Sequence, residues 1–246
     1  MNTAIFHPLY KHNSCFVFPI SPYSHGGHHM EMSFLLYTFL TLPLLLGLAK
    51  SDPESLQDYC VADPKPSFYL NGVPCINPKL VTTAHFTTSA LAKPGNTRAN
   101  PFGFNVTLTT VANLPGLNTL GLSLARVDIA ANGVVPPHSH PRASEVTICL
   151  KGSILVGFVD TSNGLYTQQL RVGESFVFPK GLIHFLFNLE SAPALAVSGL
   201  SSQNPGAQIA SLAAFTSNPY IPDDVVKKAF QITTQDVMKI RKNLGG

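Results

Sequence analysis

A succession of short strand-like segments between residues 104 and 200 constrains the fold of this chain most strongly. The segments are rich in β-branched and aromatic residues, and Gly, Asn, Asp or Pro separates them, which is typical of strands joined by turns. Asn163-Gly164 lies between two of them and is a strong hairpin signal. So many closely spaced strands predict a β-barrel or jelly roll. The expected strands are Phe104–Val111, Leu120–Ala130, Ser144–Gly152, Ser153–Asp160, Tyr166–Gly173, Ser175–Gly181, Ile183–Leu189 and Ala194–Leu200.

The composition favours the same all-β class and gives no support to nucleic-acid binding. Charged residues make up 12% of the 246 residues, against about 25% in typical soluble domains. The 20 prolines and 18 glycines suit a domain with many turns better than a helical bundle. The net charge is only +3, and no long basic run is present, so the electrostatic pattern of a nucleic-acid-binding protein is missing.

The C-terminal tail has a different pattern, which predicts two short helices. Pro222–Phe230 has acidic residues in its first turn and lysines in its last, as the helix dipole favours. The following segment begins with Thr233 and Asp236 at capping-box spacing and ends in glycine. Such a helical pair fits two roles, as a cap on its own barrel or as a clasp on a neighbouring subunit. The expected apolar stripe of the second helix consists of Val237, Ile240 and Leu244.

An apolar run near the N-terminus predicts a secretory signal peptide. Ser33–Ala49 is shorter than the roughly 20 residues of a membrane span, is interrupted by Pro43, and ends in small residues suited to cleavage after Ala49. A signal anchor is the competing interpretation, and the short length argues against it. We therefore expect a secreted chain without a stable membrane span.

Residues 1–29 precede the point at which such a signal begins. We expect them to be a non-structural extension, and translation to start at Met30 or Met32 in place of Met1.

Secretion places the cysteines in an oxidising compartment. Cys60 and Cys75 are fifteen residues apart between turn residues, and closing such a loop stabilises by about 3 kcal/mol in the chain-entropy model, so we pair them. Cys149 lies in an apolar strand and is expected to be a small core residue, whereas Cys15 is lost with the signal. The N-x-[ST] sequon at Asn105 is a candidate glycosylation site.

Four residues have the types and spacing of a metal site. His138 and His140 face the same side if they lie on a strand, between prolines that stiffen the segment. Glu145 follows after a short turn, and His184 begins a later strand. Three imidazoles and one carboxylate suit octahedral Mn(II) or Fe(II) with two open positions better than closed tetrahedral Zn(II).

These residues belong to two longer blocks that resemble the two motifs of the cupin superfamily, G(X)5HXH(X)3,4E(X)6G and G(X)5P(X)4H(X)3N. Asn132 replaces the leading glycine of the first motif, with Gly133 one step later, which affects a turn and no ligand. The stretches "SDPESLQDYCVAD", "PPHSHPRASE" and "GLSSQNPG" and the helical tail resemble plant germin-like proteins from about Ser51 onward. The remaining motif positions are His138, His140, Glu145 and Gly152 in the first block, and Gly173, Pro179, His184 and Asn188 in the second.

The resemblance implies a single cupin domain, an all-β jelly-roll barrel with C-terminal helices. It implies manganese held by the three histidines and Glu145, with iron or zinc less expected, and a homo-oligomer, a hexamer built as a trimer of dimers. Arg142 and Asn188 belong to the motifs and are expected to support the ligands, with Asn188 in the pocket wall. The expected divisions are an extension at 1–29, a signal at 30–49, a disulfide-stapled arm at 50–100, the barrel at 101–217 and a helical arm at 218–246.

The resemblance allows several activities, and two pocket-wall positions separate them. Germins proper oxidise oxalate to carbon dioxide and hydrogen peroxide, whereas many germin-like relatives resemble superoxide dismutases. In the oxalate-oxidising germins, asparagines stand at the positions of Ala125 and Val135 and can hydrogen-bond a dicarboxylate; here neither side chain can. We therefore expect little or no oxalate oxidation, and superoxide dismutation as the leading enzymatic hypothesis.

The alternatives are oxalate oxidation after all, or a non-enzymatic role. A secreted cupin of the plant apoplast or cell wall can act in defence as a structural element or as a receptor-like binder of a small ligand. Nothing in the sequence resembles the phosphate-binding loop of a nucleotide-dependent enzyme or the G-x-S-x-G element of a serine hydrolase.

Overall fold

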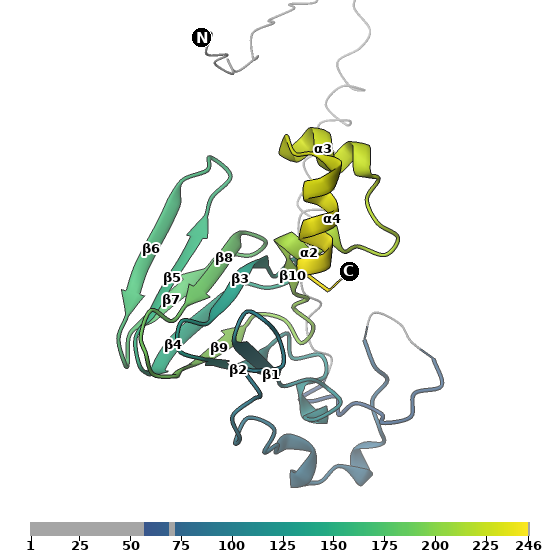
Figure 1. Ribbon diagram of the computed structural model, residues 1–246. Helices are drawn as coiled ribbons and strands as arrows, with labels where there is room; N and C mark the ends of the chain where they lie inside the picture. Colours follow the sequence, from purple (N-terminus) through teal and green to yellow (C-terminus); the bar gives the residue numbers. More distant parts are fainter. Residues whose placement is uncertain (1–56, 69–71, 246) are drawn as a thin grey trace, which may run out of the picture. The chain divides into compact units, whose positions relative to one another are not determined.

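The computed structural model describes residues 57–68 and 72–245 (Figure 1). The expected extension, the signal segment and Cys15 lie outside these residues. The described part contains two antiparallel sheets of five strands, ordered β1-β2-β9-β4-β7 and β10-β3-β8-β5-β6, which is the jelly-roll arrangement of a cupin domain. The strands are β1 (Phe104–Leu108), β2 (Ser123–Ile129), β3 (Val134–Ser139), β4 (Glu145–Lys151), β5 (Ile154–Val159), β6 (Leu165–Leu170), β7 (Ser175–Phe178), β8 (Ile183–Phe187), β9 (Ala194–Leu200) and β10 (Gln208–Ile209).

The core lies between the inner faces of the two sheets. In β9 every second residue is buried, as expected when one face of a strand points inward. The β5–β6 hairpin turns at Asn163-Gly164, and Asn163 has a φ of 64°, the left-handed conformation that asparagine tolerates. The largest buried cluster consists of Val127, Ile129, Val135, Cys149, Ile154, Val156, Leu170, Phe178, Leu186, Ala194 and Ala196.

Two strands, β3 and the two-residue β10, were not among those expected from the sequence. β3 contains Pro136 and Pro137, which have no N–H for a sheet ladder, so its sequence does not have the pattern of a central strand. The structure accommodates them with a register shift against β8 between Val135 and His138. Prolines are tolerated at such bulges, and this bulge lies directly before the first histidine.

The C-terminal tail forms α2 (Ala210–Phe215), α3 (Asp223–Phe230) and α4 (Thr234–Asn243). The expected capping box of α4 is present. The short helix α2 was not expected, because its sequence is almost wholly apolar and its N-cap residue, Ile209, makes no side-chain cap. Among the described residues, no helix combines the length and apolar character needed to cross a membrane.

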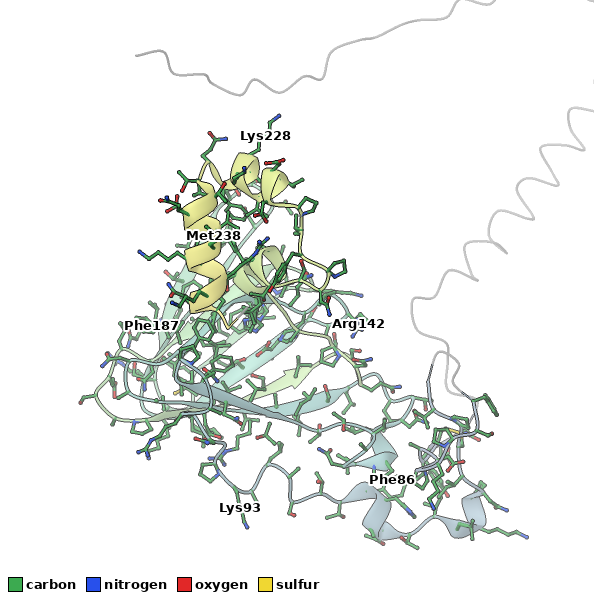
Figure 2. The ribbon with its side chains drawn as sticks, turned by 45° about the vertical axis from the view of Figure 1, so that its right-hand side comes forward. Phe86, Lys93, Arg142, Phe187, Lys228 and Met238 are labelled. Carbon is green, nitrogen blue, oxygen red and sulfur yellow. A yellow bond between two sulfur atoms is a disulfide. The ribbon has the colours of Figure 1, made fainter. Side chains whose placement is uncertain are left out.

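These helices pack on one another and on their own barrel. α2 contacts β3 and β10, and α4 contacts α2 and α3, so α2 joins the helical tail to the β10 edge of the barrel, and α3 and α4 project beyond it (Figure 1). The buried contacts between the helices come from Phe215, Val226 and Val237, with Ile240 and Leu244 from the predicted stripe packed around them. Met238 remains exposed on the outer side of α4 (Figure 2).

The segment before β1 is irregular, as predicted, and a disulfide fastens it. Cys60 and Cys75 are bonded, and an isolated β-bridge pairs Ala62 with Cys75. Two short 3-10 helices, η1 (Pro78–Leu80) and η2 (Thr83–Phe86), supply the other regular structure of this segment. A third, η3 (Pro115–Leu117), follows β1. Asp128, paired with Arg126 on β2, accepts a 2.8 Å hydrogen bond from the Gly95 backbone, which holds this segment against the barrel.

Candidate metal centre

The four predicted ligand residues meet inside the barrel. One ligand atom from each of His138, His140, Glu145 and His184 lies within 4.8 Å of the others. His138 is in β3 and His184 in β8, and the two are partners across that ladder. His140 follows β3 directly, and Glu145 begins β4 in the other sheet. The cluster therefore joins the two sheets.

Each of the three imidazoles is oriented by a backbone carbonyl that bonds its Nδ1. Nδ1 of His138 lies 2.9 Å from the Pro136 oxygen, and Nδ1 of His184 lies 2.9 Å from the Leu182 oxygen. Nδ1 of His140 is hydrogen-bonded to the Gly206 oxygen. A carbonyl oxygen only accepts, so each Nδ1 carries the proton and each Nε2 offers a lone pair to the cluster.

A carboxylate oxygen of Glu145 faces two of these lone pairs. Oε2 lies 3.0 Å from Nε2 of His140 and 3.3 Å from Nε2 of His184, yet Oε2 of Glu145 and Nε2 of His184 are buried without a hydrogen-bond donor. Buried acceptors facing one another are unfavourable unless a proton or a cation lies between them. The residues thus fit a metal ion, which would satisfy all the acceptors together.

A hydroxyl pair orients the other oxygen of the carboxylate. The Thr147 hydroxyl donates to Oε1 of Glu145 at 2.7 Å, and the Ser198 hydroxyl lies 2.7 Å from that of Thr147. Thr147 and Ser198 are fully buried. Because Oε1 is held by Thr147, Oε2 is left to face the histidines.

The protonation equilibria favour cation binding at two of the four residues. Burial, reinforced by the charge of His184, lowers the pKa of His138 to about 4, so its imidazole is neutral at physiological pH. Burial opposes ionisation of Glu145, but the adjacent imidazoles of His140 and His184, when protonated at Nε2, and the Ser198 hydroxyl favour the carboxylate and hold its pKa well below the usual value. Burial likewise lowers the pKa of His140, and the bonds to Glu145 and Gly206 outweigh it and raise that pKa. A proton on His140 is therefore the main competitor of a cation.

One apolar side chain packs on the cluster, and the two pocket-wall positions predicted from the sequence are buried in the interior. Phe178 stacks on His184 with ring centroids 4.4 Å apart. Ala125 is buried with Ala143 and Leu200, and Val135 is buried in the main core. Both positions singled out in the sequence point inward and offer no hydrogen-bond donor.

Other predicted residues lie elsewhere in the structure. Asn188 is fully buried, but its amide donates to the oxygens of Ala130 and Ala192, both at 2.8 Å, so it braces two turns and is not free to line a pocket. Asn105 is half-buried in β1, and its side chain occupies the space that a side chain at Gly95 would need.

The sequence reasoning did not find Thr147 and Ser198. The signal was available in β4, where inward positions alternate and Thr147 follows Glu145 at the next inward position. A polar residue at a fully buried strand position needs a partner, which is a reason to look for a site there.

Comparison with known proteins agrees with this geometry. Residues 89–238 match the family model described as Cupin. The chain is 59% identical over 216 residues to germin-like protein subfamily 1 member 1 of Arabidopsis thaliana, covering 86% of this chain and 100% of that protein.

Two solved structures are also similar. One is oxalate oxidase in complex with the substrate analogue glycolate, at 42% identity and a TM-score of 0.76, covering 80% of this chain and 100% of that one. The other is Peruvianin-I, described as a cysteine peptidase from Thevetia peruviana latex, at 40% identity and a TM-score of 0.62, covering 65% of this chain and 98% of that one.

Proposed function

This chain belongs to the germin-like proteins of the cupin family, and we propose that it is a secreted manganese protein that removes superoxide and does not oxidise oxalate. The observation that carries the proposal is the convergence of three imidazole lone pairs on a buried carboxylate oxygen that lacks a donor. When bound, manganese would supply a one-electron redox couple. His138, His140, Glu145 and His184 would hold it.

The ligand set supports manganese over zinc. Nitrogen and oxygen donors without a thiolate suit metals with open coordination positions, and a structural zinc site is normally tetrahedral and closed. The family resemblance adds manganese as the preferred metal. Iron has similar ligand preferences and is the alternative to test.

The apolar wall supports superoxide over oxalate. A bound dicarboxylate presents four oxygens, and Ala125 and Val135 can donate to none of them. A site that lacks donors for a polar substrate loses several orders of magnitude in discrimination. Superoxide is small and needs only access to the metal, so this wall does not disfavour it.

Cysteine peptidase chemistry, which the description of Peruvianin-I names, is not proposed for this chain. Cys149 is the free cysteine among the described residues, and it is fully buried. Burial raises the pKa of its thiol, whereas a nucleophilic cysteine needs the thiolate form.

Secretion and assembly are part of the proposal. The Cys60–Cys75 disulfide supports an oxidising, extracellular location such as the apoplast or cell wall, in a defence role, with glycosylation at Asn105. An apolar row on the outer face of one sheet supports a homo-oligomer, for which the family resemblance implies a hexamer. The row crosses four strands through Leu124, Gly199, Val146 and Val177, and three of these side chains are about half exposed.

The test of function is an assay of the purified, manganese-loaded protein against superoxide and oxalate in parallel. We expect dismutation of superoxide and no peroxide release from oxalate, and His138→Ala should lose both the metal and the activity. Robust peroxide release from oxalate would refute the substrate assignment. Dismutation by metal-free His138→Ala would refute the metal mechanism.

A further inference from the structure

Two of the three imidazoles are oriented by their own strands, and the third is not. His138 and His184 each bond the carbonyl two residues before them. His140 bonds the carbonyl of Gly206, which is 66 residues away. Gly206 lies near the end of the connection of residues 201–207 between β9 and β10, and we call its residues 201–206 the 201–206 loop. The orientation of His140 therefore depends on where this loop lies.

Arg142 fastens the same end of the loop. Its Nε donates to the Asn204 carbonyl oxygen at 2.6 Å, and its Nη2 donates to Oδ1 of Asn204 at 2.9 Å. Its backbone N–H donates to the Pro205 oxygen at 3.2 Å. Arg142, labelled in Figure 2, is exposed at the surface. An arginine two residues after His140 therefore binds the segment whose carbonyl orients the His140 imidazole.

The shape of Gly206 fits this arrangement. Its φ is 68°, a conformation that favours glycine. A Cβ added there would lie 2.9 Å from Nη2 and 3.2 Å from Cζ of Arg142. The guanidinium of Arg142 thus packs directly against the Gly206 backbone. This packing restricts the movement of the Gly206 carbonyl, which accepts the hydrogen bond from His140.

The other end of the loop is anchored without Arg142. Ser144 donates its backbone N–H to the Ser201 hydroxyl at 2.9 Å, and Ser201 donates its own to the Ser144 oxygen at 3.0 Å. The Ser123 hydroxyl donates to the Ser202 oxygen at 2.7 Å. The Gly206 end keeps the Arg142 backbone bond to Pro205 and the pairing of β10 with β3 when the Arg142 side chain is removed. Loss of the two side-chain bonds to Asn204 would therefore loosen Asn204 and Gly206 without freeing them, while the half near Glu145 stays in place.

His140 is also the most exposed of the four ligands. Its side chain is 12% exposed, against 5% for Glu145 and 2% for His184, and His138 is buried. A partly exposed ligand that is held from a surface loop can detach with the least disturbance of the core.

We propose that Arg142 and Asn204 are positioning residues that hold His140 in its metal-binding orientation through the 201–206 loop and so set the rate at which the metal leaves the site. This rests on the proposed function, in which the four residues hold manganese. The two locally oriented histidines keep their positions when the loop moves, so release begins at His140.

The first experiment measures the release of Mn(II) from the loaded protein into an excess of chelator. Arg142→Ala should release Mn(II) about tenfold to hundredfold faster, the usual effect of losing a group that orients a metal ligand. Arg142→Lys should release it nearly as fast, because an ammonium cannot bond both Asn204 oxygens in a fork. Asn204→Asp keeps an oxygen at the Oδ1 position and should stay near the wild-type rate. Arg171→Ala is the matched control, since the Arg171 side chain makes no hydrogen bond among the described residues.

The second experiment locates the effect at His140. The side-chain NMR signals of the three histidines are compared in the metal-free wild type and in metal-free Arg142→Ala. We expect the imidazole signals of His140 to shift or broaden and those of His138 and His184 to stay in place, because only His140 is oriented by the 201–206 loop. Unchanged His140 signals in Arg142→Ala would overturn the proposal.

The outcomes separate the two proposals. A wild-type protein that binds no Mn(II) overturns both. A wild-type protein that binds Mn(II), with Arg142→Ala releasing it at the wild-type rate, overturns the positioning role alone. A drop in the Tm of the metal-free Arg142→Ala protein with an unchanged release rate would assign Arg142 a purely structural role.

Discussion

The barrel interior has a polar end and an apolar end, and β4 passes through both. Glu145 and Thr147 point into the polar end, and Cys149, two residues further, points into the apolar end. Ile154 and Val156 are fully buried at the apolar end with hydrocarbon neighbours. At the polar end the buried neighbours are imidazoles and a carboxylate.

The two ends gain stability in different ways. Apolar burial contributes about 25 cal/mol per Å² whatever is bound. Buried polar groups stabilise only when every acceptor has a donor or a cation, and Glu145 and His184 each retain an acceptor without a donor. The apolar end therefore stabilises the folded state whether or not a metal is bound. The unpaired acceptors at the polar end lower the stability of the folded state until a metal binds them. Substitutions should therefore separate folding from metal binding.

The largest expected effect is at the polar end. His184→Ala should abolish stoichiometric Mn(II) binding and leave a folded protein, because it removes a ligand and also an unsatisfied buried acceptor. Equilibrium dialysis with circular dichroism checks both. His85→Ala is the control, since His85 caps η2 far from the cluster in sequence and should leave binding unchanged. An unfolded His184→Ala protein would contradict the claim that the polar end serves metal binding and not folding.

The next effect is at the apolar end. Ile154→Ala should lower the free energy of unfolding by about 2–5 kcal/mol, because it leaves a cavity in a close-packed core. The protein that remains folded should bind the same amount of Mn(II) per chain. Leu165→Ala, at a position 60% exposed on β6, should change the free energy of unfolding far less. Denaturant unfolding gives both values, and equal losses would contradict the assignment of the core.

Adding or removing Mn(II) should change the stability of only those variants that keep the polar end intact. At free Mn(II) one hundred times the Kd, binding to the native state alone should stabilise the wild type by about 2.7 kcal/mol, and chelation should remove this. The stability of Ile154→Ala should respond to Mn(II) by the same amount, and that of His184→Ala should not respond. Thermal unfolding with and without Mn(II) tests this, and a wild type indifferent to the metal would count against the site.

The smallest expected effect concerns Thr147, which supports the carboxylate at the polar end. Thr147→Val keeps the shape of the side chain but leaves Oε1 of Glu145 without its donor. We expect Mn(II) affinity to fall by about tenfold, the lower range for such supporting groups. Ser198→Ala leaves the Thr147 donor in place and should have a weaker effect. Calorimetric titration distinguishes them, and unchanged affinity in Thr147→Val would show that Thr147 is only a packing residue.

The barrel and the ligand residues could be predicted because their signals are local. Strand alternation and turn residues marked most strands, and β9 matches the expected range of Ala194–Leu200. The H-x-H spacing, Glu145 and His184 carried the ligand set, which the structure brings within 4.8 Å. β3 was not predicted as a strand because Pro136 and Pro137 are atypical of a central strand. α2 was not predicted because it has neither a capping residue nor an amphipathic pattern.

The contacts of the supporting groups could not be predicted, even for Arg142 and Asn188, which the motifs identified, because these contacts are made only by folding. Asn204 and Gly206 lie more than sixty residues from the residues they hold, and nothing in their local sequence marks a role. Asn188 belongs to a recognisable motif, yet its amide serves the backbone of two turns. Motif membership thus identified which residues matter, and the fold identified what each one contacts.

Metal analysis of the protein purified from a secreting host, without added metal, tests the central claim most directly. His138→Ala is purified in parallel. We predict about one manganese per chain in the wild type and none in the variant. Stoichiometric zinc in the wild type, or manganese retained in full by His138→Ala, would contradict the claim that these four side chains form a manganese site.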